Sequence, residues 1–127
     1  MKTTKTVRKA GFTLVEIMIV VAIIGLLAAI AIPNFVRARA TSQANACINN
    51  MRQIDAAVNE WALEQGKKTG DGPATLTGDL TPYIKLNANG AIPSCPAGGS
   101  YTVGTVGATP QVTCNLSNTV NPPHQLP

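Results

Sequence analysis

The chain has 127 residues and a formal net charge of +4, from ten Lys and Arg against six Asp and Glu. An apolar run and its flanks occupy the first third, so only one small globular domain can follow, and a large catalytic cleft is not expected. Four of the basic residues precede Gly11, namely Lys2, Lys5, Arg8 and Lys9. Ten minus four leaves six basic residues against six acidic ones after that glycine. The positive balance therefore indicates membrane topology and not a nucleic-acid surface.

The apolar run covers residues 12–32, in which Glu16 is the sole charged residue. As a helix, this run of about 21 residues would be about 32 Å long, enough to cross the core of a bilayer. Positive residues beside such a segment are retained in the cytoplasm. The sequence thus predicts a single-pass protein with a cytoplasmic amino terminus and with everything after Pro33 outside.

Two other interpretations of this run stay open. The Ala29-Ile30-Ala31 segment resembles a signal-peptidase site, and cleavage after Ala31 would release a small secreted binding domain stapled by a disulfide. The run is, however, longer than the roughly 7–15 residues of a signal core. A plain membrane anchor is the other possibility, but a charge such as Glu16 inside a spanning helix is costly and calls for a partner.

Residues 11–16 read Gly-Phe-Thr-Leu-Val-Glu, with a basic leader before them and apolar residues up to Pro33 behind them. This pattern resembles the start of a type IV pilin or a type II secretion pseudopilin, and the close resemblance covers residues 8–39. It implies that a prepilin peptidase removes residues 1–11 and methylates the new amino terminus at Phe12. It also implies a precursor in the bacterial inner membrane with a periplasmic or extracellular head. Homo-oligomeric filaments would be built by an inner-membrane assembly platform and its ATPase.

Glu16 has two expected roles. Residues 13–16 fit a capping box, in which the carboxylate satisfies a backbone donor in the first helical turn. The resemblance further implies that Glu16 meets the amino terminus of Phe12 in a neighbouring subunit, and such pairing would set the axial register. Gly25 suits close approach of a neighbouring helix, whereas Pro33 removes a backbone hydrogen bond and marks a weak point in the helix. We expect both to matter in assembly.

The apolar segment, residues 12–33, is predicted to continue as an amphipathic helix over residues 34–66. Its apolar residues recur at steps of four, three, four and three and share one face: Cys47, Met51, Ile54, Val58 and Trp61. Gly66 suits a helix C-cap because glycine adopts positive φ. We expect the apolar face to carry the core of the head.

The head, residues 67–127, is rich in Gly, Thr and Pro. A short helix is predicted to begin near Thr77 or Asp79, with an apolar face made by Leu80, Tyr83, Ile84 and Leu86. Two short strands are predicted around residues 101–103 and 111–113. Two strands alone are marginal, so they must pack on the amphipathic helix. The predicted fold class is α+β, with a long amino-terminal helix against a small head that holds an antiparallel hairpin.

Three cysteines allow three possible single disulfides, and the oxidising compartment expected for the head favours disulfide formation. Cys95 and Cys114 flank the hairpin, so we predict that they form a disulfide worth about 3 kcal/mol. Cys47 would then be a buried thiol. A disulfide-bounded loop near the carboxyl end is also familiar in the pilin family.

Catalytic and metal-binding constellations are not predicted. His124 is the sole histidine and lies in a Pro-rich tail, so a histidine-based triad has no convincing members. A zinc site made by that histidine and the three cysteines is disfavoured because their spacing contains no CxxC unit. Asp71 and Asp79 are too sparse for a calcium loop. The sequence predicts a structural protein with no cofactor and no enzymatic activity.

Overall fold

The computed structural model describes residues 10–127. The basic residues on which the topology prediction depends precede Ala10 and lie outside this range. Within this range the structure has one helix, α1 (Leu14–Glu64), and two strands, β1 (Tyr101–Val103) and β2 (Val112–Cys114). The chain divides into two compact units, one ending at Val36 and the other comprising Arg37–Pro127. The long helix and the small sheet confirm the predicted α+β class.

The amino-terminal end of α1 is held by the predicted capping box. The backbone N–H of Thr13 donates to Glu16 Oε2 at 2.8 Å, and the backbone N–H of Glu16 donates to Thr13 Oγ1 at 3.3 Å. The hydroxyl of Thr13 also donates to Glu16 Oε2, at 2.9 Å. These bonds satisfy donors that a helix start otherwise leaves free, so α1 begins at Leu14 for a local reason.

The first part of α1 exposes its apolar side chains. An 18-residue window near its start has a mean hydropathy of 2.9, and none of that window is buried. Leu14 is 76% exposed and Leu27 is 63% exposed, on different turns of the helix. Pro33 lies inside α1, which continues beyond it. This part of the helix is long and apolar enough to cross a membrane.

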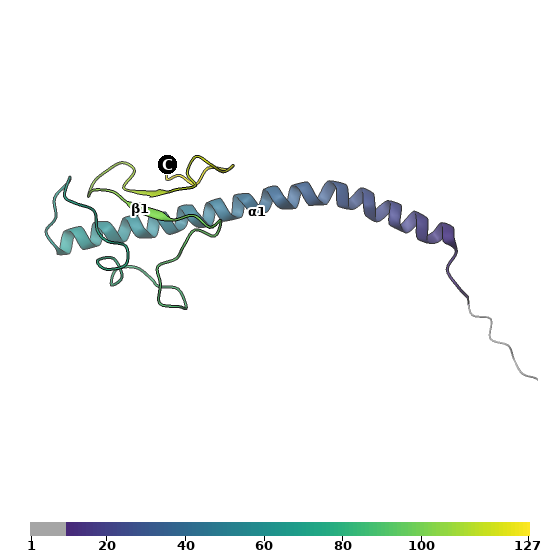
Figure 1. The fold of residues 1–127 in the computed structure, drawn as a ribbon, viewed down its shortest axis with the longest axis horizontal. Helices are drawn as coiled ribbons and strands as arrows, with labels where there is room; N and C mark the ends of the chain where they lie inside the picture. The colour runs from purple at the N-terminus through teal and green to yellow at the C-terminus, as the bar shows by residue number, and fades with distance from the viewer. Residues whose placement is uncertain (1–9) are drawn as a thin grey trace, which may run out of the picture. The chain divides into compact units, whose positions relative to one another are not determined.

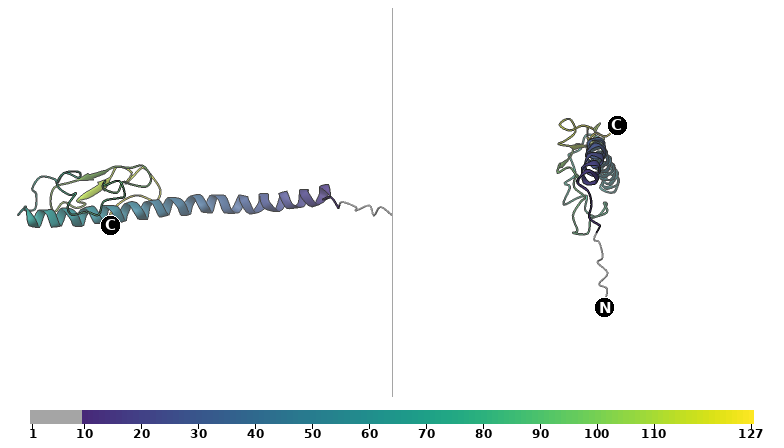
Figure 2. Two further views of the ribbon diagram at one scale, coloured as in Figure 1. Left: turned by 90° about the horizontal axis from the view of Figure 1, so that it is seen from below. Right: turned by 90° about the vertical axis from the view of Figure 1, so that its right-hand side faces the viewer.

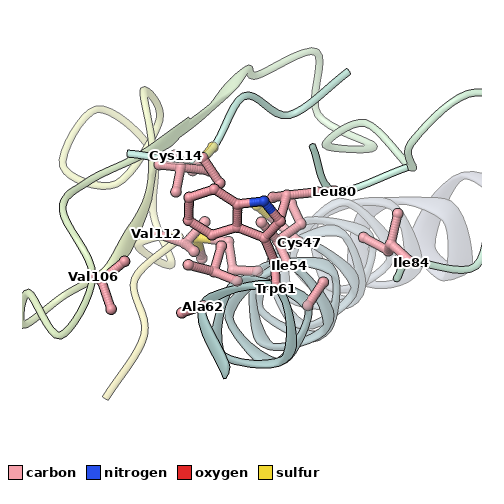
Figure 3. Packing of buried hydrophobic residues seen from close by; sticks show 14 of the residues in the cluster. Cys47, Ile54, Trp61, Ala62, Leu80, Ile84, Val106, Val112 and Cys114 are labelled. Carbon is pink, nitrogen blue, oxygen red and sulfur yellow. The ribbon is translucent and has the colours of Figure 1, made fainter. Parts of the chain in front are cut away.

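The second part of α1 carries the core of the unit Arg37–Pro127. The five residues of the predicted stripe are all buried: Cys47, Met51, Ile54, Val58 and Trp61. Figures 1 and 2 show β1 and β2 beside this part of the helix. Leu80, from the loop between α1 and β1, packs in the same cluster (Figure 3). The apolar periodicity therefore identified the core correctly.

The two strands form the predicted antiparallel hairpin. Tyr101 pairs with Cys114 and Val103 pairs with Val112. The ladder is extended by the backbone N–H of Gly104, which donates to the carbonyl of Gln111 at 2.7 Å. β2 lies one residue later than predicted, since Val112 and Cys114 are its buried positions. Alternation thus directs Cys114 into the core.

The short helix that was expected near Thr77 does not form, and residues 76–84 contain only turns and bends. The Asp79 carboxylate accepts hydrogen bonds from the Thr75 backbone N–H at 2.8 Å and from the Thr75 hydroxyl at 2.6 Å. Pro82 has no N–H with which to continue a helix. The prediction was wrong because these local bonds close one turn and the proline stops its extension.

The carboxyl end of α1 has the expected glycine cap. Gly66 has φ of +61°, and its N–H donates to the carbonyl of Leu63 at 3.4 Å. The N–H of Lys67 donates to the carbonyl of Ala62 at 2.8 Å. Together these bonds form a Schellman motif, which satisfies carbonyls left free at the helix end.

Gly66→Ala is expected to destabilise the unit Arg37–Pro127 by about 1–2 kcal/mol, because an L-residue is strained in the left-handed region. No atom lies within 4 Å of the position of the added Cβ, so a clash would not contribute. Urea unfolding of the full chain in detergent, followed by fluorescence of Trp61, measures the change. Gly72→Ala is the matched control, because that site is equally open and has no positive φ. Equal losses in both variants would contradict the role of the cap.

Candidate assembly helix and a buried cysteine and histidine cluster

The residues that are expected to take part in processing and assembly lie in the unit that ends at Val36. Gly11 precedes the helix, so the peptide bond between Gly11 and Phe12 is outside α1. Phe12 is 87% exposed. A protease requires extended, accessible backbone at the bond that it cuts, and this bond is accessible.

Gly25 and Pro33 lie farther along the same part of α1. A Cβ added at Gly25 would meet no atom within 4 Å, so no neighbour from the described part of the chain requires a glycine there. Pro33 is accommodated inside the helix. Glu16 is exposed and bonded to Thr13 through Oε2. Within residues 10–127, the contacts of these side chains give Glu16 a capping role and give Gly25 no packing role.

Comparisons with known proteins find a family motif at this end of the chain. The family described as "Prokaryotic N-terminal methylation motif" matches residues 7–32. The "Type IV major pilin protein PilA" of Myxococcus xanthus (strain DK1622) is 47% identical over 60 residues, which cover 47% of this chain and 27% of that protein. The "Type IV major fimbrial protein FimA" of Dichelobacter nodosus is 44% identical over 77 residues, covering 56% of this chain and 49% of that protein. This chain therefore carries the methylation motif at its amino-terminal end and resembles type IV major pilins.

A further pilin relative extends the match into the head. The "Fimbrial protein EcpC" of Eikenella corrodens is 38% identical over 91 residues, which cover 68% of this chain and 59% of that protein. The chain thus spans between 27% and 59% of the length of these three relatives. No solved structure matches it. The resemblance to type IV pilins is confirmed, whereas no relative named here is a pseudopilin.

The head contains a second candidate site. Cys47 on α1, Cys95 in the loop before β1, Cys114 at the end of β2 and His124 in the carboxyl-terminal segment are all buried. One ligand atom from each lies within 4.8 Å of the others. Cys95 Sγ is 3.3 Å from His124 Nδ1. Figure 3 shows Cys47 and Cys114 in the same cluster of buried side chains. Four segments that are distant in the sequence thus converge on one point.

The three cysteines are free thiols in the structure, and the pairing of Cys95 with Cys114 stays a prediction. Burial raises the pKa of Cys47 to about 12. Burial also opposes ionisation of Cys95, but hydrogen bonds from the backbone N–H groups of Ala97 and Gly99, with help from the other thiols, hold its pKa below the ordinary value of 9.0. Cys95 is therefore the thiol that loses its proton before Cys47.

The loop after Cys95 requires its two glycines. Gly98 has φ of +86°, and its N–H donates to the carbonyl of Cys95 at 2.9 Å, which closes a tight turn. Gly99 is buried, and a Cβ there would lie 2.8 Å from Cys114 Sγ. The missing side chain lets the loop pass directly beside that sulfur.

The sequence disfavours a metal site made by these four residues because their spacing contains no CxxC unit. The cluster is instead created by the helix face that carries Cys47 and by the strand alternation that buries Cys114. Two features of the sequence are consistent with this cluster: the number of cysteines is odd, and Cys47 lies on the apolar stripe. No local pattern indicated that His124 would return to this point.

Proposed function

We propose that this chain is a structural subunit of a type IV pilus, cleaved between Gly11 and Phe12 and polymerised through the apolar part of α1. The observation that carries the proposal is the match of residues 7–32 to the methylation motif, on a helix whose apolar window has no buried residue. An uncovered apolar surface of this length has to be buried in a bilayer or against other copies. A pilin meets both requirements in turn, first as a membrane-anchored precursor and then as a filament subunit.

Close contact between neighbouring helices would hold the subunits together. A helix that leaves lipid for a filament gains little hydrophobic energy, so van der Waals packing must stabilise the contact. Gly25 is open to close approach because it carries no side chain, and a Cβ built there would meet no atom within 4 Å in the described part of the chain apart from its own turns of α1. Pro33 would let the helix loosen locally as it packs.

One charge pair would set the register. Within residues 10–127 the bonds to Glu16 use Oε2, and Oε1 accepts none. Oε1 is therefore available to the amino terminus of Phe12 in a neighbouring subunit. A wrong stagger would leave both charges unpaired in an apolar environment, which costs several kcal/mol per ion. The capping box and the pair between subunits are thus compatible uses of one carboxylate.

The partners that follow are other copies of the chain, a prepilin peptidase, and the inner-membrane platform and ATPase that drive assembly. The names of the matched relatives favour a pilus over a type II secretion pseudopilus. The alternative of a secreted domain released after Ala31 is not favoured, because the motif match extends across the Ala29-Ile30-Ala31 site. Assembly by packing and one ion pair requires no catalysis by the subunit.

The amino terminus of the mature chain tests this proposal. We expect mass spectrometry of the protein, extracted from cells that carry a prepilin peptidase, to find a methylated Phe12 at the first position. Gly11→Ile should block processing, and Ala31→Ile is the matched control that should leave it unchanged. A mature chain that begins at Ile32, or processing that is lost only in the Ala31 variant, would show a conventional signal peptide and overturn the proposal.

A further inference from the structure

We propose that the head contains a closed zinc site with Cys47, Cys95, Cys114 and His124 as its four ligands. The ligand atoms of all four already lie within 4.8 Å of one another, and each side chain is buried. Three sulfurs and one imidazole nitrogen form a common ligand set of structural zinc sites. The proposal concerns the head alone and does not depend on filament assembly.

The distances fit a tetrahedral ion after a small contraction. Zn–S bonds of about 2.3 Å and Zn–N bonds of about 2.0–2.1 Å place the ligand atoms about 3.4–3.8 Å from one another. The contact between Cys95 Sγ and His124 Nδ1 is already 3.3 Å. The longest separation allowed in the cluster, 4.8 Å, exceeds the tetrahedral value by about 1 Å. Side-chain rotation suffices for a change of this size, so the backbone can stay where it is.

The ligand types select the metal. Thiolates are soft ligands that suit zinc, whereas calcium and magnesium require oxygen ligands. All four groups are at most 3% exposed, so a bound ion would have no position open to water. A closed tetrahedral site is typical of structural and not catalytic zinc.

A disulfide explains less of this arrangement. If Cys95 paired with Cys114, Cys47 would remain as a third buried thiol, and His124 would keep no thiol partner. The contact of the His124 ring found within residues 10–127 is the one to the Cys95 sulfur. Polar groups that are 2% exposed need partners, and a metal ion gives the histidine a strong one. One ion would use all four side chains.

Zinc binding to these thiols would release protons. A Zn²⁺ ion would replace the protons of three thiols, which pass to the solvent, and neutral His124 would donate the lone pair of Nδ1. The resulting centre has a net charge of −1, because three thiolates exceed the charge of the ion by one. The N–H groups of Ala97 and Gly99 lie at the Cys95 sulfur, and the Tyr101 hydroxyl lies at the Cys47 sulfur. Such donors orient and stabilise metal-bound thiolates.

The site would fasten the carboxyl-terminal half of the head to α1. A two-stranded sheet is marginal alone, and small domains commonly add a metal or a disulfide to their core. One ligand lies on α1, one lies in the loop before β1, one ends β2 and one lies in the carboxyl-terminal segment. An ion at this point would also shield the thiols from oxidation outside the cytoplasm.

Metal titration of the full mature chain in detergent tests the proposal. After reduction and removal of metals, the chain should take up one Zn²⁺ per molecule. Co²⁺ should produce thiolate charge-transfer bands and tetrahedral ligand-field bands. X-ray absorption at the zinc edge should find three sulfurs and one nitrogen, which needs no variant that has to fold. Absence of uptake after reduction, or a shell made of oxygens, would overturn the zinc site.

The His124→Gln variant tests whether His124 is a zinc ligand or only lies beside the cysteines. It should weaken zinc binding by at least about tenfold and remove nitrogen from the metal shell. Ser117→Ala is the matched control, since Ser117 lines the same pocket as His124 and Cys114 but is not in the cluster. Equal weakening in both variants would overturn the assignment of His124. A Cys95–Cys114 linkage in the extracted chain, with no zinc uptake once it is reduced, would establish the disulfide and exclude the metal site.

Discussion

Glu16→Ala is expected to leave the chain in the membrane and to abolish its assembly into filaments. Removal of the carboxylate lowers the cost of placing this helix in lipid, so insertion should be unaffected. In a filament, however, the amino terminus of each neighbouring Phe12 would be buried without a partner. Breaking one side of a buried ion pair costs about 3–5 kcal/mol, or more than a hundredfold in each subunit contact. A polymer made of such contacts should not form.

The measurement compares the amount of filament sheared from the cell surface with the amount of processed subunit in the membrane fraction. Glu16→Gln can keep the hydrogen bonds with Thr13 but carries no charge, so it separates capping from ion pairing. Glu60→Ala is a matched control, because Glu60 is an exposed carboxylate of the same helix. Normal filaments from Glu16→Ala would contradict the register role, and normal filaments from Glu16→Gln would assign Glu16 to capping alone.

The features that could be predicted from the sequence are those that neighbouring residues determine. The capping box at Thr13 needs only a carboxylate three residues later, and the cap at Gly66 needs only a residue that tolerates positive φ. The buried stripe through Met51 and Ile54 follows from helical periodicity. Each of these was correct because its cause lies within a few turns of one helix.

The features that could not be predicted depend on contacts between distant segments. Cys114 meets Cys47 only because β2 pairs with β1 in one register and its buried side chains pack with the buried stripe of α1. His124 reaches the cluster through a segment without helix or strand. The turn at Thr75 was also missed, because its side-chain bonds to Asp79 compete with the apolar spacing that suggested a helix. In the head, tertiary packing and local capping therefore prevailed over periodicity.

Ile54→Ala is expected to destabilise the head by about 2–5 kcal/mol. The side chain is fully buried at the centre of the stripe that faces β2 and Leu80 (Figure 3). Its loss removes the transfer energy of the deleted atoms and leaves a cavity that the neighbours fill only in part. Small domains have a total stability of about 5–15 kcal/mol, so this one change would remove a large fraction of it.

Urea unfolding of the full chain in detergent, followed by the fluorescence of Trp61, gives the difference in free energy. Leu63→Ala is the matched control, since it also shortens an aliphatic side chain of α1 but at a position that is 83% exposed. That variant should change stability by less than about 0.5 kcal/mol. A chelator keeps any bound metal from contributing to either value. Similar losses of stability at the two positions would mean that the head does not pack on this face of α1. The cluster of Cys47, Cys114 and His124, which depends on the same packing, would then also be contradicted.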